Sequence, residues 1–281
     1  MNDSALVAHD FARRVRLIAG VDEVGRACLA GPIVAAGVLF DLKDMAASDT
    51  GRELLEELND SKRLARGKRE RLAQAVLEHA DAVSLVSVSA TEIDRIGIDL
   101  ANVVCLEGAL LAVGERAELR LVDGRLALGA DAPVHELIVR GDGTSATIAA
   151  ASIVAKVARD RLMVGLSERY PDYGFARNKG YWSEEHVGAI TEHGRTAEHR
   201  TSFNIRAVEA GGAPPAHRSK PSRAPWRELP AAEMAAHLLA TPTIADRVWT
   251  GQPRLTGETR AAFIHRVVLG ETDRDSVARR A

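Results

Sequence analysis

Four acidic side chains stand at the ends of apolar, strand-like stretches of this 281-residue chain. Asp22 and Glu23 follow the run at residues 17–21, Asp123 ends the run at 118–123, and Asp142 follows the run at 136–140. Carboxylates with no histidine or cysteine nearby suit hard divalent cations, so this set predicts a Mg²⁺ or Mn²⁺ site rather than a zinc site. Two such ions can activate a water and stabilise the leaving oxygen when a phosphodiester is hydrolysed.

The positions of these acids along the predicted strands decide whether they meet. The carboxyl ends of neighbouring parallel strands open on one crevice, which would gather the four side chains. Adjacent side chains on a regular strand point to opposite faces, so we expect the strand to end or bulge between Asp22 and Glu23, with Gly25 permitting the distortion. A single Asp at a strand end is most simply a turn or cap residue; three such ends favour a site.

The apolar periodicity predicts an α/β protein. Strands are expected at residues 17–21, 33–40, 82–90, 118–123 and 136–140, and helices at 66–80, 99–113, 146–169 and 183–193. Thr144 and Ser145 should cap the long helix, and Cys105 should be a core residue of the second helix rather than a reactive thiol. Residues 41–57 are expected to form a loop and a short helix.

Two segments have both a structural and a functional interpretation. Six bases within residues 62–71 form either a solvated helix face or a phosphate-contacting loop. The segment 170–182 is predicted to be a loop, and it holds five aromatic residues beside Arg177 and Lys179. It is either a hydrophobic plug or a surface that stacks on a sugar or base next to a phosphate.

The composition is that of a globular protein, with 46% hydrophobic residues. Its 37 Lys and Arg against 39 Asp and Glu leave a net charge of −2, so bulk charge does not favour a polyanionic partner. Two cysteines are too few for a disulfide framework, which favours a reducing compartment. With no signal-peptide core and no apolar run approaching about 18 residues, we expect a soluble, cytoplasmic protein with no membrane association.

An ordered series of motifs resembles the ribonuclease HII family over about residues 17–208. It begins with Val21-Asp22-Glu23-Val24-Gly25-Arg26 and Leu29-Ala30-Gly31-Pro32, and continues through Asp60-Ser61-Lys62, Val122-Asp123-Gly124, Gly141-Asp142, the run at 148–162, Asn178-Lys179-Gly180-Tyr181 and His199-Arg200 with Ser202-Phe203. Each motif alone is weak, whereas the ordered set is specific.

The resemblance implies a ribonuclease H-like five-stranded mixed sheet with flanking helices, and a role for each matching residue. Asp22, Glu23, Asp123 and Asp142 would form the catalytic set that binds two Mg²⁺ or Mn²⁺ ions. The family's Gly-Arg-Gly segment senses the ribose 2′-hydroxyl; here it reads Gly25-Arg26-Ala27. Ala27 is costly if that position needs a positive φ or a close backbone approach, and harmless otherwise.

The resemblance also implies substrate contacts beyond that segment. Tyr181 would stack on the sugar of the deoxynucleotide after the ribonucleotide, and Lys62 and Ser145 would contact phosphates. Asp160 matches the family pattern, but its mid-helix position indicates an ion-pair partner.

The implied activity is hydrolysis on the 5′ side of ribonucleotides, in RNA–DNA hybrids or at single ribonucleotides in duplex DNA, leaving 3′-hydroxyl and 5′-phosphate ends. The alternatives are a ribonuclease HIII-like hybrid-only nuclease and a non-catalytic nucleic-acid-binding module. A nucleotide-binding protein is disfavoured because no Gly-Lys-Ser/Thr follows the glycines at 20 and 25.

The domain organisation follows from the extent of the motifs and a shift in composition. We expect an N-terminal arm at residues 1–16, a catalytic domain at 17–209, a flexible linker at 210–230 and a small helical extension of unknown role at 231–281. The linker is rich in Gly, Pro, Ser and basic residues. We expect a monomer.

Overall fold

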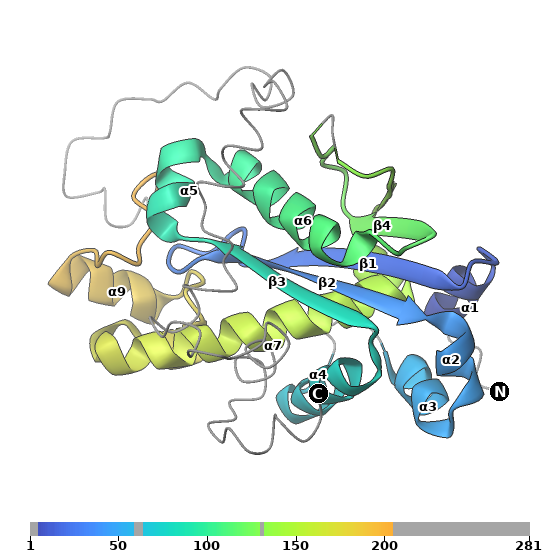
Figure 1. The fold of residues 1–281 in the computed structure, drawn as a ribbon. Coiled ribbons are helices and arrows are strands. Elements are labelled where there is room, and N and C mark those ends of the chain that lie inside the picture. The colour runs from blue at the N-terminus through green and yellow to red at the C-terminus, as the bar shows by residue number, and fades with distance from the viewer. Residues whose placement is uncertain (1–4, 59–63, 130–131, 205–281) are drawn as a thin grey trace, which may run out of the picture.

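The computed structural model describes residues 5–58, 64–129 and 132–204, and its centre is a five-stranded mixed sheet (Figure 1). The strands are β1 (Leu17–Val24), β2 (Ile33–Asp41), β3 (Ala82–Val88), β4 (Leu119–Asp123) and β5 (Glu136–Ile138), in the order β3-β2-β1-β4-β5. The first three strands pair antiparallel, whereas β4 and β5 run parallel to β1. This confirms the predicted α/β sheet.

Helices cover both faces of the sheet. Figure 1 shows α6 (Ile98–Gly114) on one face and α7 (Ala146–Arg169) on the other, with α4 (Arg66–His79) beside α7. Alternate residues of β1 serve these two layers: Ile18 packs in the cluster with α7, and Val21 in the cluster with α6. Each fully buried aliphatic side chain of this kind contributes about 1.5–3 kcal/mol.

The two central helices approach the sheet closely. A Cβ on Gly20 would lie 2.7 Å from the backbone of Thr147, so the absence of a side chain lets the start of α7 rest on β1. On the other face Cys105 lies fully buried within α6, and burial raises the pKa of its thiol. The predicted core role of Cys105 is confirmed.

The remaining helices differ in part from the expectation. Residues 41–57 form two helices, α2 (Leu42–Ala47) and α3 (Asp49–Glu57), and α5 (Ala90–Ile96) leads into α6. The arm before β1 contains α1 (Ala5–Phe11), whose buried Asp10 accepts hydrogen bonds from Thr147 N and Oγ1 at 2.9 and 2.8 Å. Its tie to α7 was not visible in the sequence because the two segments lie 137 residues apart.

The C-terminal part of the described chain returns to the end of the β1–β2 hairpin. A short α8 (Phe175–Asn178) lies within the segment predicted as a loop, and α9 (Glu184–His193) follows it, close to the hairpin end in Figure 1. Leu29 N donates a hydrogen bond to Gly180 O at 2.8 Å, and Gly31 N to Glu198 O at 2.8 Å. Segments from both ends of the domain therefore build one surface.

Some predictions lie outside the described residues: Lys62, the linker at 210–230 and the extension at 231–281. Within the described part of the chain, no single helix has the length and hydropathy of a membrane span. Only α5 and α6 taken together reach that length and hydropathy, and this pair is bent by 115°.

Candidate active site

Three of the four predicted acids come together where β1 and β4 end. One carboxylate oxygen from each of Asp22, Glu23 and Asp123 lies within 4.8 Å of the other two. The cause is the parallel register of the strands, in which Val21 pairs with Val122. The next residue of each strand is an aspartate, so the two aspartates lie side by side.

The strand does not end or bulge between Asp22 and Glu23, contrary to the expectation. β1 pairs regularly with β2 through Val24. Adjacent side chains of such a regular strand point to opposite faces of the sheet, and Asp22 bonds Ser152 of α7 on one of these faces. The pairing of β1 with β4 stops at Val21, so Asp22 and Glu23 lie just beyond the last residue of β1 that pairs with β4.

Asp142 lies beside this three-carboxylate cluster rather than within it. It belongs to a 3₁₀ turn, η2 (Gly141–Gly143), because β5 ends at Ile138 and Arg140 adopts a left-handed φ of 57°. The turn is tied to the cluster, since Gly141 N donates to Asp123 Oδ1 at 2.5 Å. Asp142 is 8% exposed, and its negative charge contributes to raising the pKa of Asp22.

The cluster has the electrostatics of a cation site. Asp22 is 5% exposed, and burial together with the charges of Asp123 and Glu23 raises its pKa well above the usual value. A carboxylate so placed is destabilised in its charged form unless a cation neutralises it. Oxygen donors from three carboxylates are the set that Mg²⁺ or Mn²⁺ prefers, so the residues fit such an ion.

We expect Mn²⁺ or Mg²⁺ to raise the melting temperature of the protein. The acids converge only in the folded state, so the ion should bind the folded protein and not the unfolded chain. Asp22→Asn should itself raise the melting temperature of the metal-free protein by roughly 3 °C, the equivalent of about 1 kcal/mol of relieved repulsion. It should also weaken the response to metal. Calorimetric scans with and without metal measure both effects, with the exposed Asp172→Asn as control. An unchanged wild-type transition at saturating Mn²⁺ would argue against the site.

The segment after the acids turns sharply at Gly25, whose φ is +90°. A Cβ there would collide with the guanidinium of Arg159. Ala27, by contrast, is exposed and has no positive φ, so its methyl group imposes no backbone cost. Arg26 is half exposed and pairs with Asp99 at 2.6 Å.

Two buried arginines that the sequence reading did not single out hold this segment in place. Arg200 donates to the carbonyls of Gly25, Arg26 and Gly31 at 2.7–3.0 Å. Arg159 donates to Pro32, Ala30 and Lys179 at 2.8–3.0 Å. Both side chains are at most 1% exposed. The run at 148–162 holds four charged residues, so its composition did not distinguish Arg159 from the others.

Tyr181 lies on the same surface, next to α7. Its ring is 36% exposed, with Lys156 Nζ 5.5 Å and Arg159 Cζ 5.7 Å from the ring centroid. Burial of the hydroxyl and the adjacent Cys28 raise the pKa of Tyr181 to about 12. Lys156 also pairs with Asp160 at 2.6 Å, which confirms Asp160 as an ion-pair partner.

Ser145 lies at the N-terminus of α7, where both a cap and a phosphate contact were predicted. Its side chain is fully buried, and its hydroxyl accepts from Ile148 N at 3.2 Å as the N-cap of α7. The predicted capping role is therefore confirmed, and the phosphate contact stays a prediction.

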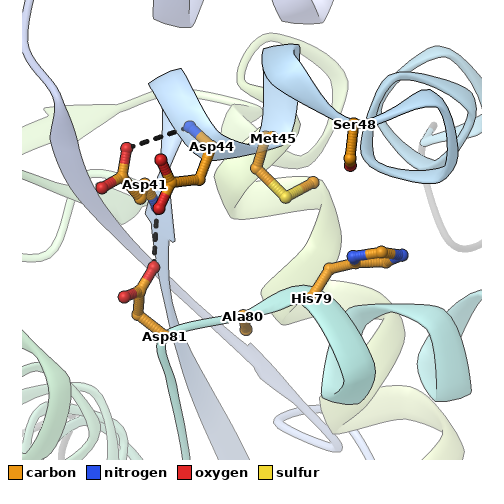
Figure 2. Close-up of a pocket in the computed structure, with 7 residues that line it drawn as sticks. All are labelled: Asp41, Asp44, Met45, Ser48, His79, Ala80 and Asp81. Carbon is orange, nitrogen blue, oxygen red and sulfur yellow. Dashed lines mark hydrogen bonds between the residues drawn. The ribbon is translucent and has the colours of Figure 1, made fainter.

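A separate pocket of about 230 Å³ lies at the opposite end of the sheet (Figure 2). Two of its aspartates accept hydrogen bonds from backbone N–H groups. Asp41 Oδ1 accepts from Asp44 N at 3.2 Å, and Asp81 Oδ2 accepts from Asp41 N at 3.0 Å. Asp41 pairs with Leu17, the first residue of β1, five residues before Asp22. At about 3.3 Å per residue the pocket is roughly 16 Å from the cluster, too far to belong to it.

The chain is similar to known proteins in both sequence and fold. The sequence matches the family model of ribonuclease HII over residues 19–206. Ribonuclease HII of Chlorobium luteolum is 43% identical over 204 residues, which cover 72% of this chain and 94% of that protein. The crystal structure of ribonuclease H2 from Pyrococcus horikoshii OT3 covers 69% of this chain and 98% of its own, with a TM-score of 0.55 and 24% identity. Bst-RNase HIII in complex with Mn²⁺ has a TM-score of 0.55 and 18% identity, covering 74% of this chain and 73% of its own.

Proposed function

Because the chain belongs to the ribonuclease HII family and is a ribonuclease H hydrolase, we propose that it hydrolyses the phosphodiester 5′ to ribonucleotides. The substrates are RNA–DNA hybrids and duplex DNA with single embedded ribonucleotides, and the products carry 3′-hydroxyl and 5′-phosphate ends. The convergence of Asp22, Glu23 and Asp123 within 4.8 Å carries this proposal. In a module that only binds nucleic acid, clustered carboxylates would repel one another and the phosphate backbone, which would weaken binding.

Mg²⁺ or Mn²⁺ is the proposed cofactor, held by Asp22, Glu23 and Asp123, with Asp142 alongside. The Mn²⁺ complex of Bst-RNase HIII, which shares the fold, supports a divalent ion here. When bound, such ions supply an activated water and stabilise the leaving oxygen. The chain's own part is to orient the acids: Ser152 bonds Asp22, and Gly141 N fixes Asp123.

The substrate side of the site is the surface formed by residues 25–27 and Tyr181. We propose that the backbone of Gly25-Arg26-Ala27 reads the ribose 2′-hydroxyl, the group that distinguishes the two sugars. Arg26 and Ala27 are exposed in this segment, whereas Gly25 is buried. Tyr181 presents a partly exposed ring for stacking on the next sugar. Lys62 remains a proposed phosphate contact from outside the described residues.

A duplex DNA carrying one ribonucleotide, incubated with Mg²⁺, Mn²⁺ or EDTA, tests the function. We expect metal-dependent nicking on the 5′ side of the ribonucleotide. Cleavage confined to a hybrid with a run of ribonucleotides would favour the ribonuclease HIII-like alternative. Binding without nicking of either substrate would favour the non-catalytic module.

Tyr181→Ala should reduce kcat/KM for the single-ribonucleotide duplex roughly tenfold, because base or sugar stacking on an aromatic ring contributes about 1–3 kcal/mol. Cleavage of a continuous hybrid should fall less, since it offers further ribose contacts. Tyr181→Phe keeps the ring and serves as the control. Equal losses on the two substrates would count against stacking at the DNA junction.

The catalytic unit is proposed to span residues 17–209, which agrees with a family match ending at residue 206. We propose that residues 210–230 link this unit to a separate helical extension at 231–281. We propose a monomeric, cytoplasmic enzyme, and its two free cysteines fit a reducing compartment.

A further inference from the structure

Two buried histidines contact each other behind the substrate surface. His186, in α9, is 0% exposed, and His199, in the segment after α9, is 3% exposed. Their Nε2 atoms lie 3.1 Å apart. Phe175 lies 5.4 Å from the His186 ring and 5.7 Å from the His199 ring, centroid to centroid, so an aromatic wall shields the pair.

The hydrogen-bond partners determine which nitrogen of each ring carries the proton. Thr196 N donates to His199 Nδ1 at 2.9 Å, so this nitrogen must accept and the proton must be on His199 Nε2. His199 Nε2 then donates to His186 Nε2, which leaves His186 Nδ1 as the donor to Tyr181 O at 2.8 Å. The result is one continuous chain of three hydrogen bonds from Thr196 to Tyr181.

Both rings are neutral in this arrangement, because a cationic ring would turn an acceptor nitrogen into a donor. Burial lowers the pKa of His186, and burial with the nearby His186 and Arg195 lowers the pKa of His199 to about 4. The chain of donors therefore keeps one direction at neutral pH.

The end of this chain is the backbone of the proposed stacking residue. Tyr181 N donates to Asn178 O at 2.9 Å, and Tyr181 O accepts from His186, so both polar groups of its peptide backbone are held. His199 also forms a β-bridge with Ala30, in the loop that follows Gly25-Arg26-Ala27. The pair thus connects the two segments of the substrate surface.

We propose that the His186–His199 pair is a positioning device that fixes Tyr181 relative to the ribose-sensing loop. This inference rests on the proposed function, because it assigns Tyr181 its stacking role. Neither histidine touches the substrate; they act through the Tyr181 backbone. Two apolar rings could fill the same space but could not donate a hydrogen bond to Tyr181 O.

A double-mutant cycle separates positioning from general packing. His186→Phe should lower kcat/KM for the single-ribonucleotide duplex roughly tenfold, since small displacements of a positioning group are costly. His186→Asn, whose amide nitrogen replaces Nδ1 as the donor, should recover most of that loss. In the Tyr181→Ala background, His186→Phe should cause no further loss, because the ring it positions is gone. A loss of equal size in both backgrounds would overturn the proposal.

Nitrogen-15 NMR of the wild-type histidines provides a test that needs neither activity nor a folded variant. At neutral pH we expect His186 protonated on Nδ1 and His199 protonated on Nε2. The opposite tautomers, or a charged ring, would overturn the hydrogen-bond chain. Failure of the wild type to nick a ribonucleotide would instead overturn the proposed function, while the NMR result still decides the arrangement of the pair.

Discussion

Asp123→Asn is expected to lower ribonucleotide-directed nicking about a thousandfold or more, with duplex binding retained. The change removes one charge from the three-carboxylate cluster, and cation binding at such sites supplies several kcal/mol of charge stabilisation. Each 1.36 kcal/mol corresponds to a factor of ten in rate. The fold should survive, because an asparagine oxygen can still accept the bond from Gly141 N that Asp123 accepts at 2.5 Å.

Single-turnover nicking and a binding assay in EDTA measure the two sides of this prediction. Asp172→Asn is the matched control, since it removes the same charge from an exposed position in the 3₁₀ turn η3 (Pro171–Tyr173). It should have nearly wild-type activity. Turnover of Asp123→Asn within tenfold of the wild type would contradict the assignment of Asp123 to the cation site.

Arg200→Met should destabilise the protein by roughly 3–5 kcal/mol and impair nicking together with stability. The wild-type guanidinium, 1% exposed, donates four hydrogen bonds to the carbonyls of Gly25, Arg26 and Gly31. Hydrogen bonds from a charged donor contribute about 1.5–3 kcal/mol each, and the buried acceptors would lose them at once. Burial lowers the pKa of Arg200 to about 10, which still leaves it charged at neutral pH.

Urea unfolding of the wild type and the variant measures this loss. Arg177→Met is the matched control, because Arg177 is exposed and pairs with Glu185 on the surface. Its effect on the free energy of unfolding should stay within about 0.5 kcal/mol. Arg200→Lys keeps the charge but not the planar fork, so it should lie between the two. A destabilisation by Arg200→Met below about 1 kcal/mol would show that the loop does not depend on this residue.

Much of the fold was predictable because its signals are local. The alternating apolar runs predicted all five strands, and the long helix over 146–169 was predicted at the bounds it has. The weakest local signals gave the errors: the strand predicted at 136–140 ends at Ile138, and α8 was missed because a four-residue helix has no periodicity to detect. α1 was also missed, and its hydrogen bonds to Thr147 join segments far apart in the sequence.

The acidic site was predictable in composition and in its place at the ends of neighbouring parallel strands, but not in its detailed arrangement. The residue types and their place at strand ends indicated a divalent cation, and the ordered motifs indicated the family. That Asp142 lies beside the cluster depends on the left-handed Arg140 and the η2 turn. That Ser145 is inaccessible depends on the burial of the α7 N-terminus. Neither property can be read from the neighbouring residues in the chain.

The sequence by itself determined the chemistry available to this protein: the oxygen ligands, the turn at Gly25 and the apolar pattern that builds the sheet. Only the tertiary structure decided which groups act together. Arg200 holds Gly25 from 175 positions away, and His199 lies across a β-bridge from Ala30. Such partners are brought together by strand register and helix packing. Those depend on contacts between distant segments, and no local spacing encodes them.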